Sequence, residues 1–183
     1  MAASEDEIVR RVVLLGAMGA GKTTVGALLA RRLGWTHLDL DREIEKRERR
    51  PVAEIFRTDG EARFRALEGE LTAELAGRTR LVISPGGGWI TNSANLAALG
   101  PGTLSLWLRV SPETALQRIG AAPGSRPLLT GPDPLGAARR LLAERERDYA
   151  LADAVVDTEE MSVAEVVEAT AVAVLFRISI PSN

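Results

Sequence analysis

The eight residues 16–23, Gly-Ala-Met-Gly-Ala-Gly-Lys-Thr, constrain the fold of this chain more than any other feature. They match the pattern G-x-x-x-x-G-K-[ST], a phosphate-binding loop (P-loop) whose glycines turn the backbone tightly and direct N–H groups at a phosphate. The apolar run 12–15 precedes the loop, as a buried parallel strand does, and a helical pattern follows over 23–33. Strand, loop and helix in this order predict a nucleotide-binding α/β fold rather than a glycine-rich turn that binds nothing.

The rest of the chain alternates between strand-like and helix-like segments. Short apolar runs end at residue 39 and cover 80–84, 103–108 and 154–156, and helical patterns cover 41–50, 52–56, 60–76, 93–99, 112–119, 137–149 and 163–175. This alternation predicts three α/β/α layers with a central parallel five-stranded sheet. Residues 120–136 are rich in glycine and proline, and a loop of this length is typical of a functional segment such as a lid.

Composition limits the function classes. With 183 residues, 45% apolar and 26% charged, the chain suits one domain over residues 1–183. A net charge of −2 and 4% aromatic residues do not indicate nucleic-acid binding, and the uncharged stretch 81–108 contains too many prolines and glycines for a membrane helix. The absence of cysteine excludes disulfides and zinc–thiolate sites, and the single histidine, His37, cannot form a multi-histidine metal site. We therefore expect a cytoplasmic monomer that acts on small molecules.

Five further segments carry a family resemblance. In chain order they are D-x-D at 39–41, F-x-x-x-G-E-x-x-F-R at 56–65, a triple glycine at 86–88, Arg-Pro-Leu-Leu at 126–129 and Arg-x-x-x-Tyr at 145–149. Together they make the chain resemble the shikimate kinases from about residue 12 to residue 157. The resemblance implies a P-loop kinase fold with a mobile lid loop at about 118–136 and an acceptor-binding region at about 39–65. It also implies transfer of a phosphoryl group from ATP, with Mg²⁺, to the 3-hydroxyl of shikimate, in aromatic amino acid biosynthesis.

The nucleotide side of the site follows partly from the P-loop chemistry. Lys22 is expected to reach the outer phosphates, and the Thr23 hydroxyl to ligate Mg²⁺. The resemblance adds Asp39, which would help to hold Mg²⁺, and two arginines, Arg118 and Arg126, which flank or lie in the glycine- and proline-rich loop 120–136. The expected ATP-binding residues are Gly19, Ala20, Gly21, Lys22, Thr23, Thr24, Arg118 and Arg126.

The acceptor side is predicted from the chemistry of shikimate, a small carboxylate with three hydroxyls. A carboxylate favours the planar fork of arginine, so Arg65 and Arg145 are the candidates. The hydroxyls need a carboxylate and backbone N–H donors, which Asp41 and the loop Gly86, Gly87 and Gly88 could supply. Phe56 and Phe64 could line the apolar side of the ring.

Each of these residues also has a structural interpretation. Asp39 and Asp41 could cap the helix that follows them. Arg65 could lie on a solvated helix face, and Arg145 belongs to a charge-rich stretch that must mostly face water. The triple glycine could be a flexible turn, and the two phenylalanines could be core residues.

The expected catalytic residues are Lys22, Asp41 and Arg126. Lys22 and Arg126 would neutralise the transferring phosphoryl group, and Asp41 would orient the attacking hydroxyl and accept its proton. The chain departs from the family pattern in two places: Glu159 and Glu160 stand where basic residues often contact adenine, and Pro85 precedes the triple glycine. The alternatives are a gluconate or nucleoside monophosphate kinase of the same fold, or a catalytically inactive relative that serves as a binding module.

Overall fold

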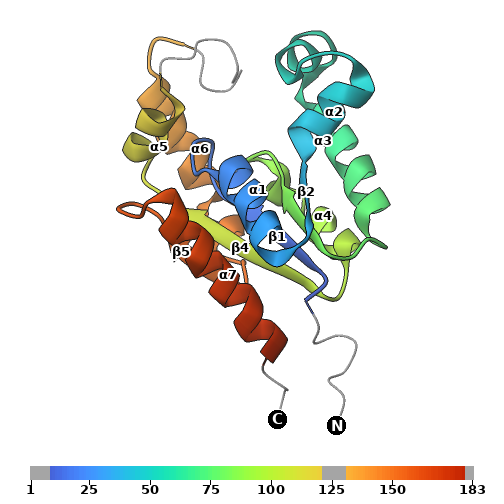
Figure 1. Cartoon of the computed structure of the whole chain (residues 1–183). Coiled ribbons are helices and arrows are strands. Elements are labelled where there is room, and N and C mark those ends of the chain that lie inside the picture. The colour runs from blue at the N-terminus through green and yellow to red at the C-terminus, as the bar shows by residue number, and fades with distance from the viewer. Residues whose placement is uncertain (1–8, 121–130, 180–183) are drawn as a thin grey trace.

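The computed structural model describes residues 9–120 and 131–179, and five parallel strands form its sheet (Figure 1). They are β1 (Arg11–Leu15), β2 (Thr36–Asp39), β3 (Leu81–Ser84), β4 (Thr103–Arg109) and β5 (Ala154–Asp157). Their order is β2-β3-β1-β4-β5, so β1 is central, with Val12 opposite Val82 on one side and Leu104 on the other. The expected parallel five-stranded sheet is confirmed.

The strands are apolar because both faces of the sheet are covered. All five residues of β1 are buried, and its four apolar side chains alternate between two core clusters. Val12 and Leu14 pack in one cluster, whereas Val13 and Leu15 pack in the other. The continuous apolar run in the sequence therefore reflects two cores, one on each side of the sheet.

Helices cover both faces and complete the three layers. On one face lie α1 (Lys22–Leu33) and α7 (Val163–Ser179), whose buried residues share a cluster with Val12 and Leu14. On the other lie α2 (Leu40–Glu48), α3 (Val52–Leu75), α4 (Ser93–Leu99) and α6 (Pro134–Tyr149). Helix α5 (Pro112–Ile119) follows β4. Among the described residues, no helix has the length and apolar character needed to cross a membrane.

Most predicted boundaries lie within a few residues of the observed ones, and three differences have local causes. Residues 52–75 form one helical element, α3, but Gly60 (φ 82°, ψ 167°) breaks it into the two predicted segments. Helix α6 begins at Pro134 rather than at residue 137, because Asp133 caps it by accepting from the Gly136 N–H. An unpredicted 3₁₀ turn, η1 (Trp89–Thr91), follows the triple glycine.

The predicted lid at 118–136 is only partly described. Its first residues belong to the end of α5 and its last to the start of α6. Residues 121–130, which include Arg126, lie outside the described residues.

The carboxyl ends of the strands form the edge that carries function in such folds. The loops after β1 and β3 and the start of α2 meet there, and two helical elements rise on opposite sides of it (Figure 1). One is α2 with the start of α3, and the other is α5 with the start of α6.

A buried arginine ties together the opposite edge of the sheet. Arg11 at the start of β1 is 4% exposed and donates to four backbone carbonyls at 2.6–2.8 Å and to the Thr103 hydroxyl at 3.2 Å. The carbonyls belong to Ala76, Arg78, Leu99 and Pro101, which follow or end α3 and α4. Its five N–H donors are therefore all used, which explains how the guanidinium can be buried on neutral acceptors.

Candidate active site

A cavity of about 600 Å³ lies at the carboxyl edge of the sheet. The P-loop, α2, α3, the loop after β3, α5 and α6 all contribute to its wall. It is lined by every predicted site residue that the structure describes: Gly19, Ala20, Gly21, Lys22, Thr23, Thr24, Asp39, Asp41, Phe56, Phe64, Arg65, Gly86, Gly87, Gly88, Arg118 and Arg145.

The P-loop has the backbone shape that its glycines permit. Gly19 and Gly21 have φ of 85° and 90°, in the left-handed region that other residues rarely adopt. Lys22 Nζ donates to the carbonyls of Gly16 at 2.7 Å and Ala17 at 3.0 Å, so the lysine lies along the loop. The first turn of α1 has no acidic residue, so the positive helix end is not neutralised and suits an anion.

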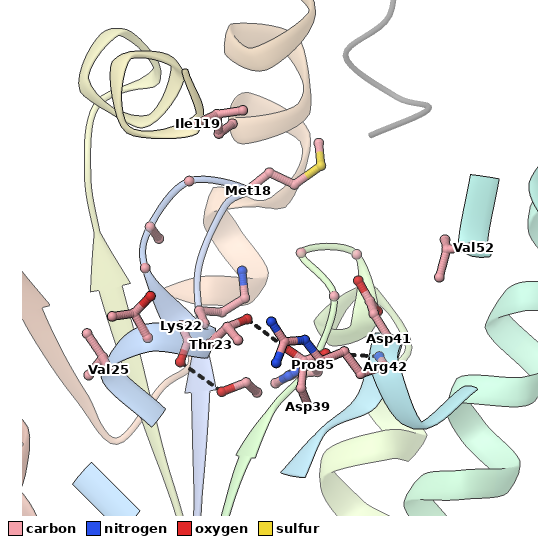
Figure 2. Close-up of a pocket in the computed structure, with 18 of the residues that line it drawn as sticks. Met18, Lys22, Thr23, Val25, Asp39, Asp41, Arg42, Val52, Pro85 and Ile119 are labelled. Carbon is pink, nitrogen blue, oxygen red and sulfur yellow. Dashed lines mark hydrogen bonds between the residues drawn. The ribbon is translucent and has the colours of Figure 1, made fainter. Parts of the chain in front are cut away.

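Thr23 and Asp39 meet beside the P-loop, as Figure 2 shows. The Thr23 hydroxyl donates to Asp39 Oδ2 at 2.5 Å, and Asp39 Oδ1 accepts from the Arg42 N–H at 3.1 Å. Asp39 therefore both caps α2 and faces the P-loop, whereas Asp41 is not the cap. The capping interpretation is correct for Asp39 and wrong for Asp41.

This oxygen pair fits Mg²⁺ that arrives with a nucleotide. Mg²⁺ is usually held by one or two protein oxygens together with phosphate oxygens and waters. No group of three or more His, Cys, Asp or Glu side chains that could hold a metal exists within residues 9–120 and 131–179. Thr23 and Asp39 are thus suited to sharing the ion with phosphates rather than to binding it alone.

Arg65 and Arg145, the two arginines predicted to bind the acceptor, are not solvated surface residues. The Arg65 side chain is 21% exposed, and its guanidinium contacts Glu68 Oε2 at 2.5 Å and Glu61 Oε1 at 2.8 Å. Arg145 is 8% exposed, although its neighbours in the sequence are exposed. Only one side of α6 faces the cavity, so Arg145 is buried there while its charged neighbours in the sequence face water.

The triple glycine packs directly against these side chains. A Cβ atom at Gly88 would lie 2.6 Å from Arg65 Cζ, and one at Gly87 would lie 3.5 Å from Arg145 Nη1. The Tyr149 hydroxyl donates to the Gly87 carbonyl at 2.5 Å, which fixes the loop against α6. The loop is therefore held in place by neighbouring elements and is not a free turn.

Two carboxylates converge on Gly86. A Cβ atom there would lie 3.1 Å from Asp41 Oδ1 and 3.0 Å from Glu68 Oε1. Both oxygens are buried without a hydrogen-bond partner among the described residues. Burial raises the pKa of Asp41 to about 6, with Asp39 adding to the effect, and burial raises the pKa of Glu68 to about 7 against the opposing charge of Arg65. Asp41 lines the cavity and Glu68 does not, so Asp41 is the one of these two carboxylates that a ligand in the cavity can reach.

Glu68 was missed by the sequence reasoning. Its signal is weak, since an acid three residues after Arg65 on a helix is ordinary. Its burial follows from the packing of α3 against the loop after β3, where Trp89 Nε1 donates to Thr72 Oγ1 and Thr72 Oγ1 donates to the Glu68 carbonyl.

Phe56 and Phe64 are both core and wall. Their ring centroids are 4.9 Å apart, and Phe64 is 3% exposed, yet both residues line the cavity. The Arg65 guanidinium carbon lies 5.5 Å from the Phe64 ring centroid, so the phenylalanine also supports the arginine.

Ser84 and His37 connect the end of β3, just before the triple glycine, with the start of α1. The Ser84 hydroxyl donates to the Lys22 carbonyl at 2.8 Å and lies 2.9 Å from His37 Nε2. Because the hydroxyl has a single proton, His37 Nε2 must be the donor to it. Burial lowers the pKa of His37, which agrees with a neutral structural ring.

At the far end of the cavity, Arg118 is bound to the segment after β5. Its guanidinium donates to Thr158 Oγ1 at 3.0 Å and to the Thr158 carbonyl at 2.5 Å. Met161 and Val163 also line this end, whereas Glu159 and Glu160 do not. Glu159 and Glu160, which depart from the family pattern, therefore do not form part of the cavity wall.

Comparison with known proteins gives a consistent family. The shikimate kinase family model matches residues 18–174. A shikimate kinase of Moorella thermoacetica is 48% identical over 155 residues, covering 85% of this chain and 88% of the relative. The solved structure of shikimate kinase from Acinetobacter baumannii in complex with shikimate has a TM-score of 0.88 and 34% identity, and covers 95% of this chain and 97% of that one. A gluconokinase from Sinorhizobium meliloti, with a TM-score of 0.60 and 19% identity over 94% of each chain, shares the fold alone.

Proposed function

This chain belongs to the shikimate kinase family, and we propose that it transfers the γ-phosphoryl group of ATP to the 3-hydroxyl of shikimate, giving shikimate 3-phosphate and ADP. One observation carries the assignment of its residues. The P-loop, the partly buried Arg65 and the buried Arg145 line the same cavity, together with Asp41 and the triple glycine. Such a cavity can bring a nucleotide and a small anionic acceptor together.

ATP would bind along the P-loop. The loop N–H groups and the N-terminus of α1 would surround its phosphates, and Lys22 would leave its carbonyl contacts to reach the outer ones. Thr23 and Asp39 would hold Mg²⁺ together with the phosphate oxygens. The ion supplies positive charge that polarises the phosphates and offsets the charge of the transition state.

Shikimate would bind between α3, α6 and the triple glycine. Its carboxylate would pair with Arg65 and Arg145, whose burial strengthens the pairing because water competes less. Arg65 is already oriented by Glu61 and Glu68, so little side-chain freedom is lost on binding. The hydroxyls would meet the loop 86–88 and the Asp41 carboxylate, which line the same cavity.

In the transfer step, the shikimate hydroxyl oxygen forms a bond to the γ-phosphorus while the bond from that phosphorus to the bridging oxygen of ADP breaks. The hydroxyl proton passes to the Asp41 carboxylate, whose raised pKa suits a proton acceptor near neutral pH. Lys22 stabilises the negative charge on the oxygens of the transferring phosphoryl group. Arg126 would add a second positive charge from the lid; it lies outside the described residues, and its role rests on the sequence motif.

An acceptor without a carboxylate fits this cavity less well. A neutral polyol would place no negative charge beside Arg65 and Arg145, which both line the cavity. A nucleoside monophosphate would need a pocket for its base beside the phosphate. The paired arginines therefore favour a small carboxylate acceptor.

The test is ADP release from Mg·ATP with shikimate, gluconate and nucleoside monophosphates as parallel acceptors. Strong stimulation by shikimate alone is expected. Turnover with another acceptor and none with shikimate would overturn the acceptor assignment and keep the kinase fold. ATP binding without turnover on any acceptor would favour a binding module. Size-exclusion chromatography in the same buffer tests the expected monomer.

A further inference from the structure

Helix α5 carries Arg118 and rests on few apolar contacts. Ala115 is its one buried residue, and it packs against the P-loop. A Cβ atom at Gly19 would lie 2.8 Å from the Ala115 carbonyl carbon, so helix and loop are in close contact. The position of α5 therefore sets where the P-loop and Arg118 stand relative to each other.

Glu159 binds the first turn of this helix from the segment after β5. Its carboxylate accepts from the Ser111 N–H at 2.8 Å, the Ser111 hydroxyl at 2.8 Å and the Thr114 hydroxyl at 2.5 Å. Ser111 is also the N-cap of α5, since its hydroxyl oxygen accepts from the Thr114 N–H at 3.1 Å. A negative charge at this end of a helix is favoured by the helix dipole as well.

The last turn of α5 is bound to Thr158, the residue before Glu159. Arg118 donates to both the hydroxyl and the carbonyl of Thr158, and Thr158 is buried and bonded in turn to the Arg109 carbonyl. Two consecutive residues, Thr158 and Glu159, thus hold both ends of α5. These polar contacts compensate for the small apolar footprint of the helix.

We propose that Glu159 is a positioning residue for the nucleotide. By holding the first turn of α5 against the segment after β5, it keeps Arg118 and the contact between Ala115 and the P-loop in the arrangement that binds ATP. Glu159 does not line the cavity, so it acts through α5 and not by touching ATP. The proposal rests on the proposed function in one respect, because it assigns the nucleotide to this half of the cavity.

Three variants separate this role from a general effect of charge. Glu159→Ala removes the three hydrogen bonds. Glu159→Gln keeps an oxygen for the Ser111 N–H, and its amide can donate to the hydroxyl oxygens of Ser111 and Thr114. Glu160→Ala is the matched control, because Glu160 is the neighbouring residue with the same charge and makes no hydrogen bond or ion pair with another described residue.

The first measurement is ADP affinity by calorimetry in the absence of any acceptor. We expect Glu159→Ala to weaken ADP binding and to raise KM for ATP by about 10-fold, as for the loss of a hydrogen bond to a charged group. KM for shikimate should stay within about 2-fold, Glu159→Gln within about 3-fold of wild type, and Glu160→Ala close to wild type. A merely structural role would raise both KM values together.

A double-mutant cycle with Thr114→Val tests the path. If Glu159 acts through the first turn of α5, the two substitutions should be less than additive in ADP affinity. Full additivity, an equal loss in Glu160→Ala, or unchanged ADP affinity in Glu159→Ala would each overturn the proposal. Because ADP binding is measured without acceptor, these outcomes leave the shikimate assignment untouched.

Discussion

Gly88→Ala should disable the acceptor site without unfolding the protein. Gly88 has φ −93° and ψ −3°, a negative-φ conformation in the bridge region that is open to alanine as well as to glycine. The new methyl would lie 2.6 Å from Arg65 Cζ and 3.0 Å from Arg65 Nη1. Because two carbon atoms in contact lie about 3.5–4.0 Å apart, one of the two groups must move by about 1 Å. The guanidinium is the end of a flexible side chain, and its displacement breaks the contacts with Glu61 and Glu68.

The expected cost follows from the contact that is lost. A hydrogen bond to a charged group contributes about 1.5–3 kcal/mol, so loss of the Arg65–carboxylate contact should weaken shikimate binding about 10- to 150-fold. KM for ATP should change less than about 3-fold, because the P-loop is not touched. Shikimate affinity by calorimetry and both KM values from ADP release measure this difference.

Two controls make the result interpretable. Gly69→Ala, inside α3, places its methyl 3.6 Å from Asn95 Oδ1, an ordinary van der Waals distance, and should leave both KM values unchanged. The double variant Gly88→Ala with Arg65→Ala should bind shikimate no worse than Arg65→Ala alone. Unchanged shikimate affinity in Gly88→Ala, or an equal loss of ATP affinity, would refute the reasoning. A double variant much weaker than Arg65→Ala would show that the methyl blocks the ligand directly.

Three other predictions concern buried charges. Asp41→Asn should lower kcat about 100-fold or more in the ADP-release assay, because the hydroxyl loses its proton acceptor; a normal kcat would remove Asp41 from the transfer step. The pKa of Glu68, raised to about 7 by burial and by Asp41 against Arg65 and Arg145, means that the folded state binds its proton more tightly than the unfolded state. The free energy of unfolding should therefore fall as pH rises from about 4.5 to about 7, by on the order of 1–3 kcal/mol. Urea titrations at about pH 5 and about pH 8 measure this fall, and Glu68→Gln should reduce the difference between the two values. An identical pH slope in both proteins would contradict the assignment. Arg11→Met should lower the free energy of unfolding by about 3–5 kcal/mol, and Tm by on the order of 10 °C, since four backbone carbonyls lose their donor; shikimate turnover at low temperature should persist, and an unchanged Tm would mean that water replaces the guanidinium.

The sequence was most informative where the physical cause is local. The P-loop glycines and the apolar run before them predict a strand, a tight turn and a helix, because backbone sterics and side-chain periodicity act over a few residues. Helix ends follow local rules for the same reason. Ser111 with Pro112 starts α5, and Gly34 ends α1 in the left-handed conformation.

The family motifs single out candidate site residues, but they do not show which of those residues are buried. The motifs drew attention to Arg65 and Arg145, but a charged residue in a helix is solvated in most contexts. Its burial depends on which side of the helix faces the sheet and on what packs there. Glu68 shows the limit, since nothing in its local sequence indicates a buried carboxylate beside Asp41 and Gly86.

The sequence alone therefore determined the class of fold, the phosphate loop and the set of candidate side chains, because short-range geometry and residue chemistry are written in adjacent positions. The tertiary structure decided the strand order, the burial that raises the pKa of Asp41 and Glu68, and the bonding of Glu159 to Ser111, 48 positions away. Each of these depends on which surfaces exclude water from one another, and desolvation is a property of the packed chain rather than of any segment of it.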